Sequence, residues 1–153
     1  MNAIRRLRVL LGCAAVLALT ACGGPVEDTR PGQPVKTRQM AFKDILRVFE
    51  PMGVMLRTGE YKPEKFVAFA EQLIARRDAP WAHFAPDTDY PPSKSRAEVW
   101  RKPERFTQLR EEFIAATDDL LAAARGGELA AVSKAYARVY DLCESCHQEF
   151  KKR

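Results

Sequence analysis

The chain has 153 residues, of which 46% are hydrophobic and 29% are charged. A folded chain of this size can bury roughly two thirds of its unfolded surface, so its core does not need disulfide bonds. Residues 1–21 carry three arginines and no acidic residue, and without them the formal net charge falls from +5 to +2, which gives no electrostatic case for nucleic-acid binding.

Residues 1–21 have the layout of an export signal. Three arginines precede an apolar run from Val9 to Leu19, which is too short to span a bilayer as a folded helix. The run leads into Leu19-Thr20-Ala21-Cys22, which resembles the bacterial lipobox, where cleavage precedes the cysteine and that cysteine is modified with lipid. We therefore expect a lipoprotein signal peptide over residues 1–21, lipidation at Cys22, and an exported domain anchored on the periplasmic side of a bacterial membrane. The alternative is an ordinary secretory cleavage nearby, with Cys22 lost or left free.

Residues 22–34 are rich in proline and glycine and show no apolar period, which is typical of a flexible tether. A flexible linker of about eleven residues reaches on the order of 15 to 20 Å, enough to hold a small domain off a membrane surface. From residue 35 onward, apolar residues recur at helical spacing, and no strand-like alternation is seen in the sequence. We therefore expect one folded domain over residues 35–153.

The first helix is expected from Val35 to Arg57, with an apolar stripe along one side and Gly59 at its end. Pro51 lies inside this segment. An internal proline removes one backbone hydrogen bond and clashes with the preceding turn, so we expect a kink or a break near residues 48–50. Pro63 opens the second helix, because proline is well suited to a first-turn position.

Residues 78–102 form a long connection that holds four of the ten prolines and both tryptophans, Trp81 and Trp100. Loops of this length usually have a task or are disordered, and the aromatic content argues against disorder. We therefore expect an ordered crossover. A third helix opens at Pro103 and stops at Gly126-Gly127.

A fourth helix is expected from about Glu128, and it carries Cys143-Glu144-Ser145-Cys146-His147. Two thiols three residues apart can each form a thioether with a haem vinyl group, and the histidine that follows can place an imidazole nitrogen on the iron. On a helix the spacing i, i+3 and i+4 puts Cys143, Cys146 and His147 on one face. The motif therefore predicts one covalently attached haem c, with His147 as an axial iron ligand.

Two other uses of these cysteines have less support. A structural zinc site needs four thiolate or imidazole ligands, and beyond the motif only His83 is there to add to the three. A redox dithiol of the thioredoxin kind sits at the start of a helix after a strand, whereas this pair lies near the end of a helix. A dithiol or a disulfide is the main alternative to haem attachment.

Four amphipathic helices, joined by a short turn, a long crossover and another short turn, predict an all-α fold, an antiparallel four-helix bundle with the haem attached to its last helix. A haem motif at the C-terminal end of such a helix resembles the cytochrome c′ family, and the resemblance covers residues 35–152. The stretches that carry it are Arg38-Gln39, Pro80-Trp81-Ala82-His83-Phe84, Ala97-Glu98-Val99-Trp100 and Phe150-Lys151.

The resemblance implies His147 as the single protein ligand to iron. It also implies that Phe42, four residues after Arg38, faces the distal side of the haem and that Arg38 pairs with a haem propionate. A phenyl ring has no lone pair for iron, so the haem would be five-coordinate and suited to nitric oxide or carbon monoxide. Lys151 stands where the family commonly has arginine, and lysine keeps the charge but lacks the planar fork.

A low-spin electron-transfer cytochrome of the same bundle family, with a sixth methionine or histidine ligand, is the alternative function. Low-spin relatives carry methionine at the position that Phe42 occupies here. Met52, Met55 and His83 are the other candidate donors, although methionines at such positions are more often flexible core fillers. Met40 is turned about 200° away from Phe42 on a helix, which makes it a poor substitute.

The sequence favours a haem protein rather than an enzyme, because it places no nucleophile beside a base and no paired carboxylates in a recognisable pocket. We expect it to bind a diatomic gas and to undergo one-electron redox, with a periplasmic redox partner. A homodimer is left open, since many family members dimerise through the first helix, where Pro51 departs from the family. A non-haem interpretation is an anchored helical interaction module.

Overall fold

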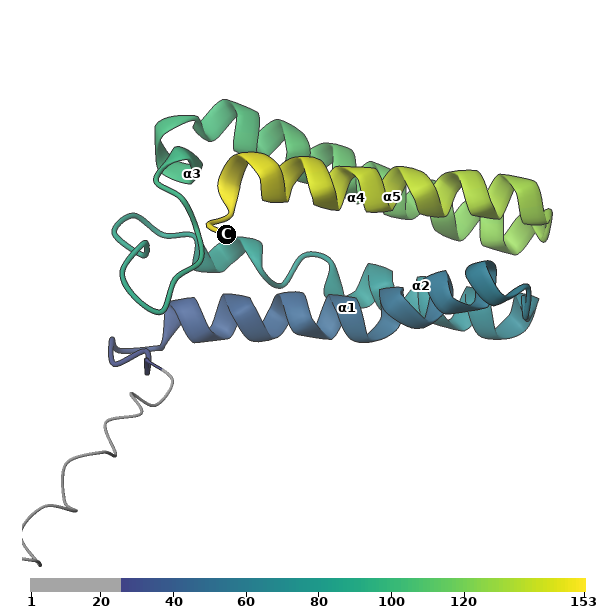
Figure 1. The fold of residues 1–153 in the computed structure, drawn as a ribbon, viewed down its shortest axis with the longest axis horizontal. Coiled ribbons are helices and arrows are strands. Elements are labelled where there is room, and N and C mark those ends of the chain that lie inside the picture. The colour runs from purple at the N-terminus through teal and green to yellow at the C-terminus, as the bar shows by residue number, and fades with distance from the viewer. Residues whose placement is uncertain (1–25) are drawn as a thin grey trace, which may run out of the picture.

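The computed structural model describes residues 26–153, so the predicted signal segment and Cys22 lie outside the described part. Four long helices make up the bundle: α1 (Pro34–Thr58), α2 (Pro63–Arg76), α4 (Pro103–Gly126) and α5 (Leu129–Phe150). They run alternately in opposite directions, and α1 packs on α2, α2 on α4 and α4 on α5 (Figure 1). The predicted all-α, antiparallel four-helix bundle is confirmed.

The helices begin and end at the signals expected from the sequence. A proline opens α2 and α4, where its missing N–H would have no partner anyway. Gly59 follows α1 with φ 72° and Gly127 follows α4 with φ 75°, left-handed conformations that glycine adopts without a steric penalty. The Glu128 carboxylate caps α5 by accepting hydrogen bonds from the N–H groups of Ala130 and Ala131.

Helix α1 continues through Pro51, so of the kink or break predicted near residues 48–50 the break is absent. The side chains on both sides of the proline are buried: Val48 and Phe49 are 4% exposed and Met52 is 0% exposed. An interior proline costs about 3 kcal/mol. Burial of each of these three side chains contributes about 1.5 to 3 kcal/mol, so their packing outweighs the lost backbone hydrogen bond.

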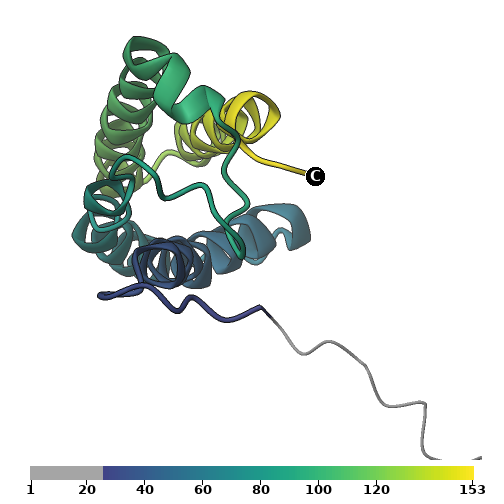
Figure 2. The same ribbon diagram turned by 90° about the vertical axis from the view of Figure 1, so that its left-hand side faces the viewer.

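The connection between α2 and α4 is an ordered crossover, as expected, and contains the short helices η1 (Trp81–His83) and α3 (Glu98–Arg101). Its last part pairs with the residues after α5: Ser95 and Lys151 form an isolated bridge, and Lys152 N donates to Lys94 O at 2.7 Å. Figure 2 shows the crossover lying across the end of the bundle. We call this end, where α1 begins and α5 terminates, the crossover end.

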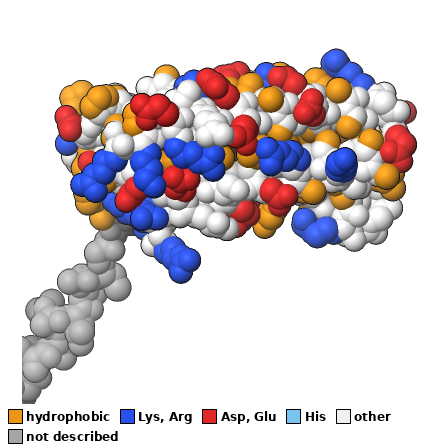
Figure 3. All heavy atoms as spheres, turned by 90° about the horizontal axis from the view of Figure 1, so that it is seen from above, with side chains coloured by type: hydrophobic (Ala, Val, Ile, Leu, Met, Phe, Trp, Pro, Cys, Tyr) orange, Lys and Arg blue, Asp and Glu red, His pale blue; other side chains and the backbone are white. Residues whose placement is uncertain are grey.

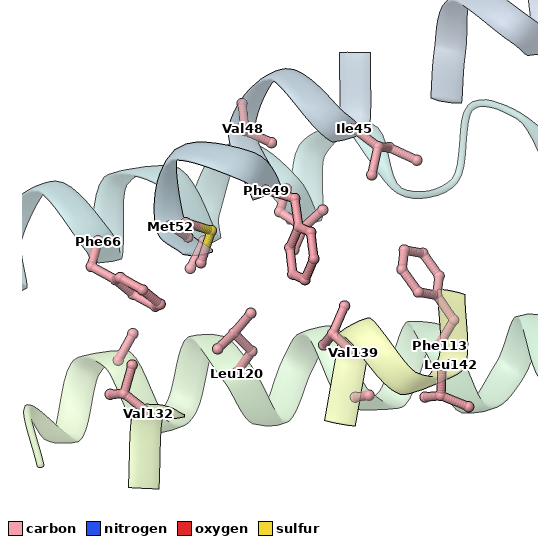
Figure 4. Packing of buried hydrophobic residues seen from close by; sticks show 14 of the residues in the cluster. Ile45, Val48, Phe49, Met52, Phe66, Phe113, Leu120, Val132, Val139 and Leu142 are labelled. Atoms are coloured by element: carbon pink, nitrogen blue, oxygen red, sulfur yellow. The ribbon is translucent and has the colours of Figure 1, made fainter. Parts of the chain in front are cut away.

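The core lies between the four long helices. Figure 4 shows Met52 and Phe66 on one side facing Leu120 and Val132 on the other. On the last helix Leu142 is buried, with 3% of its surface exposed, whereas Leu129 is 48% exposed and Tyr140 is 51% exposed. Within residues 26–153, none of the helices combines the length and apolar composition needed to cross a bilayer.

Candidate haem site

The three motif residues lie in the last turns of α5, at the crossover end of the bundle. Cys143 and Cys146 are free thiols that pack partly against the core, and no disulfide joins them. Burial raises the pKa of both thiols to about 11, with Cys146 adding to the effect on Cys143 and Glu149 to that on Cys146. A thioredoxin-type dithiol requires the opposite shift, a lowered pKa, so the site does not favour that alternative.

His147 is exposed on one side, where it lines a groove of about 790 Å³. Partial burial and the nearby Lys151 ammonium lower the pKa of His147, while Glu144 opposes them. The lowered pKa keeps the imidazole neutral at neutral pH, which is the form that binds a metal ion. The side chain therefore has both the access and the protonation state that an axial ligand needs.

Phe42 belongs to a cluster of aromatic rings at the same end of the bundle. Its ring lies edge-on to Trp81 at 5.4 Å between centroids and 6.2 Å from Phe84. Phe84 in turn lies 5.0 Å from Phe106, and Phe106 lies 5.3 Å from Phe150, three residues after His147. The rings link the start of α1 to the end of α5, so the structure brings the predicted distal residue and the motif to one end of the molecule.

The Trp81 side chain tests whether the residues at the crossover end fit a bound haem. Its indole Nε1 is buried and has no acceptor among residues 26–153. A buried N–H without a partner is costly, and native proteins nearly always supply one. A haem carboxylate is an acceptor of the required kind. The free cysteines, the neutral histidine and this unpaired donor together fit a covalently attached haem.

Arg38 is almost fully buried, with 2% of its surface exposed, and its guanidinium holds the crossover. Nη1 donates to His83 O at 3.0 Å and to Thr88 Oγ1 at 2.7 Å. Nη2 donates to Thr88 O at 2.5 Å and to Ser93 Oγ at 2.6 Å. Only Nε remains for another acceptor, so pairing of Arg38 with a haem propionate stays a prediction and would have to use that atom.

The other candidate iron ligands differ in where they lie. Met52 and Met55 are buried in the core, with 0% and 8% of their surfaces exposed, which matches the expectation that they fill space. Met40 is 54% exposed. His83 lies in η1 of the crossover, and its backbone oxygen accepts from Arg38, a contact that does not involve its imidazole.

The sequence analysis missed Asp28, Thr88 and Ser93. Asp28 was assigned to a flexible tether, yet it is 2% exposed and its carboxylate accepts from the N–H groups of Val35 and Lys36 at the start of α1. Residues 28–33 therefore belong to the folded domain, and the tether prediction is left with residues 22–27, of which 22–25 lie outside the described part. No local pattern could have found these contacts, because the partners of Asp28 and Arg38 depend on the fold.

A four-helix bundle whose last helix presents two free cysteines and an adjacent histidine beside an aromatic cluster defines a haem protein of the bundle class. The chain belongs to the cytochrome c′ family, whose model matches residues 33–151. The cofactor of this family is covalently attached haem c.

Three relatives illustrate the match. Cytochrome c′ of Rubrivivax gelatinosus is 28% identical over 126 residues, which is 81% of this chain and 98% of that protein. The structure of Shewanella frigidimarina cytochrome c′ has a TM-score of 0.78 at 25% identity, covering 82% of this chain and 98% of that one. A ferrous variant of Alcaligenes xylosoxidans cytochrome c′ with bound nitric oxide has a TM-score of 0.75 at 30% identity, covering 83% and 99%.

Proposed function

We propose that this chain is a periplasmic, lipid-anchored cytochrome c′ whose haem binds nitric oxide or carbon monoxide. In this proposal Cys143 and Cys146 carry the haem through thioethers, and His147 ligates the iron. The haem would supply a redox-active iron with one position open to a small ligand. The observation that carries the proposal is the shared location of the motif on α5 and of Phe42 on α1 at one end of the bundle.

The aromatic cluster supports a gas-binding role for the distal side. Phe42 has no lone pair to give to iron, and its ring is held in place by edge-on contacts with Trp81 and Phe84. A fixed apolar ring would leave room only for a small neutral molecule and would disfavour water. Variants of cytochrome c′ from Alcaligenes xylosoxidans have been seen with nitric oxide and with carbon monoxide bound.

The N-terminal segment supports export and anchoring. Residues 1–21 have the signal layout, and Cys22 stands where a lipobox places the lipid-modified cysteine. The haem iron would exchange single electrons with a periplasmic partner. Met40 and Val54 are 54% and 49% exposed on α1, and a homodimer formed through α1 would cover them. Light scattering of the purified protein tests the dimer.

Optical spectra of the purified, haem-loaded protein test the gas-binding proposal. We expect a high-spin ferrous spectrum that shifts on addition of carbon monoxide or nitric oxide. A low-spin ferrous spectrum without added ligand, or no shift with carbon monoxide, would show a sixth protein ligand. That result would favour the alternative, an electron-transfer cytochrome with a methionine or histidine on the distal side.

A further inference from the structure

The chain enters the bundle at the crossover end and is fixed there by Asp28. Besides capping α1, the Asp28 carboxylate accepts a hydrogen bond from Tyr90 Oη in the crossover at 2.7 Å. Arg30 donates to Asp87 O at 2.8 Å, and its guanidinium lies 3.9 Å from the centre of the Tyr90 ring. Residues 28–30 are thus held against the same crossover that covers the candidate haem site.

This attachment limits how far the bundle can stand from a lipid on Cys22, and the step rests on the lipid anchor proposed above. Cys22 and Asp28 are six residues apart, which spans at most about 20 Å when fully extended. Helix α1 has 25 residues and is therefore about 37 Å long. The anchor would keep the crossover end near the membrane, whereas the opposite end could lie much farther away.

The crossover end also carries a group of basic side chains, which we call the basic patch. Its members are Lys94, Arg96, Lys151, Lys152 and Arg153, all of them exposed. Backbone pairing brings the two segments together: Arg96 N donates to Phe150 O at 2.8 Å and Lys152 N to Lys94 O at 2.7 Å. Figure 3 shows Lys and Arg side chains at this end of the molecule.

Most of the positive charge in the basic patch is not neutralised. Arg96 pairs with Glu98 at 3.2 Å. The groove that His147 lines is also lined by Glu144 and by Arg96, Lys151, Lys152 and Arg153, so four of the five members of the patch border the candidate haem ligand. Within residues 26–153, however, no carboxylate forms an ion pair with Lys94, Lys151, Lys152 or Arg153. The patch is therefore a surface of net positive charge beside the end of α5.

We propose that the basic patch seats the crossover end of the bundle on anionic phospholipid headgroups. Each lysine or arginine near an anionic membrane strengthens binding by about fivefold. A tether of six residues leaves the bundle free to lie on its side or to stand on its crossover end. The basic patch selects the second arrangement, which turns the candidate haem site toward the membrane and toward reactants that reach it there. The short distance to the lipid favours a membrane over a soluble acidic protein as the partner.

The test uses haem-loaded protein without the lipid, made with Cys22→Ser behind an ordinary secretory signal. Binding is measured by co-sedimentation with vesicles of phosphatidylcholine alone and with vesicles containing 30% phosphatidylglycerol. We expect binding only to the anionic vesicles, with loss at high salt because these charges are exposed to solvent. The double variant Lys94→Gln/Lys152→Gln should bind about 25-fold more weakly. The matched control, Lys62→Gln/Lys65→Gln, removes two charges near the opposite end and should bind as the parent does.

Equal binding to neutral and anionic vesicles, or equal loss in the two double variants, would overturn the assignment. So would binding to polyglutamate without binding to anionic vesicles, which would assign the patch to an acidic protein. The lipid anchor is tested separately, by detergent-phase partition of the native protein. If the native protein stays in the aqueous phase, the lipid anchor is refuted. The vesicle experiment still tests the basic patch, because it uses protein without the lipid.

Discussion

Replacing Arg38 with methionine should lower the free energy of unfolding by about 3 to 6 kcal/mol. The guanidinium donates four hydrogen bonds that tie α1 to the crossover. A hydrogen bond from a charged group contributes about 1.5 to 3 kcal/mol, and we count two of the four as fully lost because the crossover can relax toward water. Domains of this size are stable by about 5 to 15 kcal/mol, so the variant would lose a large share of its stability.

Urea denaturation followed by far-ultraviolet circular dichroism measures this loss. Arg38→Lys keeps the charge, but one ammonium cannot reach all four acceptors, so about half of the loss should remain. Arg47→Met is the matched control on the same helix, because the Arg47 side chain is 75% exposed and its one ion pair within residues 26–153 is with Asp44. An exposed ion pair of this kind is worth at most about 1 kcal/mol.

The role of Arg38 in holding the crossover is refuted if the free energies of unfolding of Arg38→Met and the parent differ by no more than about 1 kcal/mol, which is the contribution of an exposed ion pair. Comparing Arg38→Met with its parent again in a haem-free background, Cys143→Ser/Cys146→Ser, separates the contribution of the crossover hydrogen bonds from that of a haem propionate. A loss seen in both backgrounds belongs to the crossover contacts. A loss confined to the haem-loaded protein would assign Arg38 to a haem propionate instead.

Three further predictions concern α1 and the segment before it. Phe42→Met should supply a sixth ligand and turn the ferrous spectrum low-spin, and a spectrum that stays high-spin would place Phe42 away from the iron. Gly53→Ala should destabilise by about 1 to 3 kcal/mol, because a Cβ there would meet the Tyr136 hydroxyl; urea denaturation measures this, and Tyr136→Phe should recover part of the loss if the clash is real. Burial opposes ionisation of Asp28, but hydrogen bonds from Tyr90 and from backbone N–H groups outweigh it and lower the pKa of the carboxyl below 3.8. The stability that this carboxylate provides is therefore present above pH 3.8 and lost as pH falls through the folded-state pKa. Acid titration should show the gap between parent and Asp28→Asn closing in that range, and a gap that persists at lower pH contradicts the assignment.

The helices and the motif could be predicted because their signals are local. Pro63 and Pro103 mark helix starts, Gly59 and Gly127 mark ends, and the structure has each of them in that role. The spacing of the motif fixes its shared face on any helix. These features depend on residues within about one or two turns of each other, which a sequence displays directly.

The contacts of Asp28 and Arg38 could not be predicted, because each joins segments far apart in the chain. Asp28 meets Tyr90 62 residues later, and Arg38 meets Ser93 55 residues later. A proline-rich and glycine-rich composition suggested a tether for the first segment, yet the buried Asp28 carboxylate and the Arg30 guanidinium hold it against the crossover. The prediction of a break at Pro51 was wrong for a related reason, because whether a helix breaks at an internal proline depends on how the neighbouring side chains pack.

The packing of α1 also bears on why the haem would lack a sixth protein ligand. Met52 lies ten residues beyond Phe42, which is about 15 Å farther along the helix axis. Its side chain is fully buried opposite Leu120 and Val132 (Figure 4). Withdrawing it from the core would leave a cavity, at a cost comparable to a large-to-small substitution, about 2 to 5 kcal/mol. Because α1 has no break at Pro51, the helix also cannot rotate locally to bring that sulfur to the crossover end. The packing of the bundle would therefore keep Met52 away from the iron, in addition to the effect of the Phe42 ring.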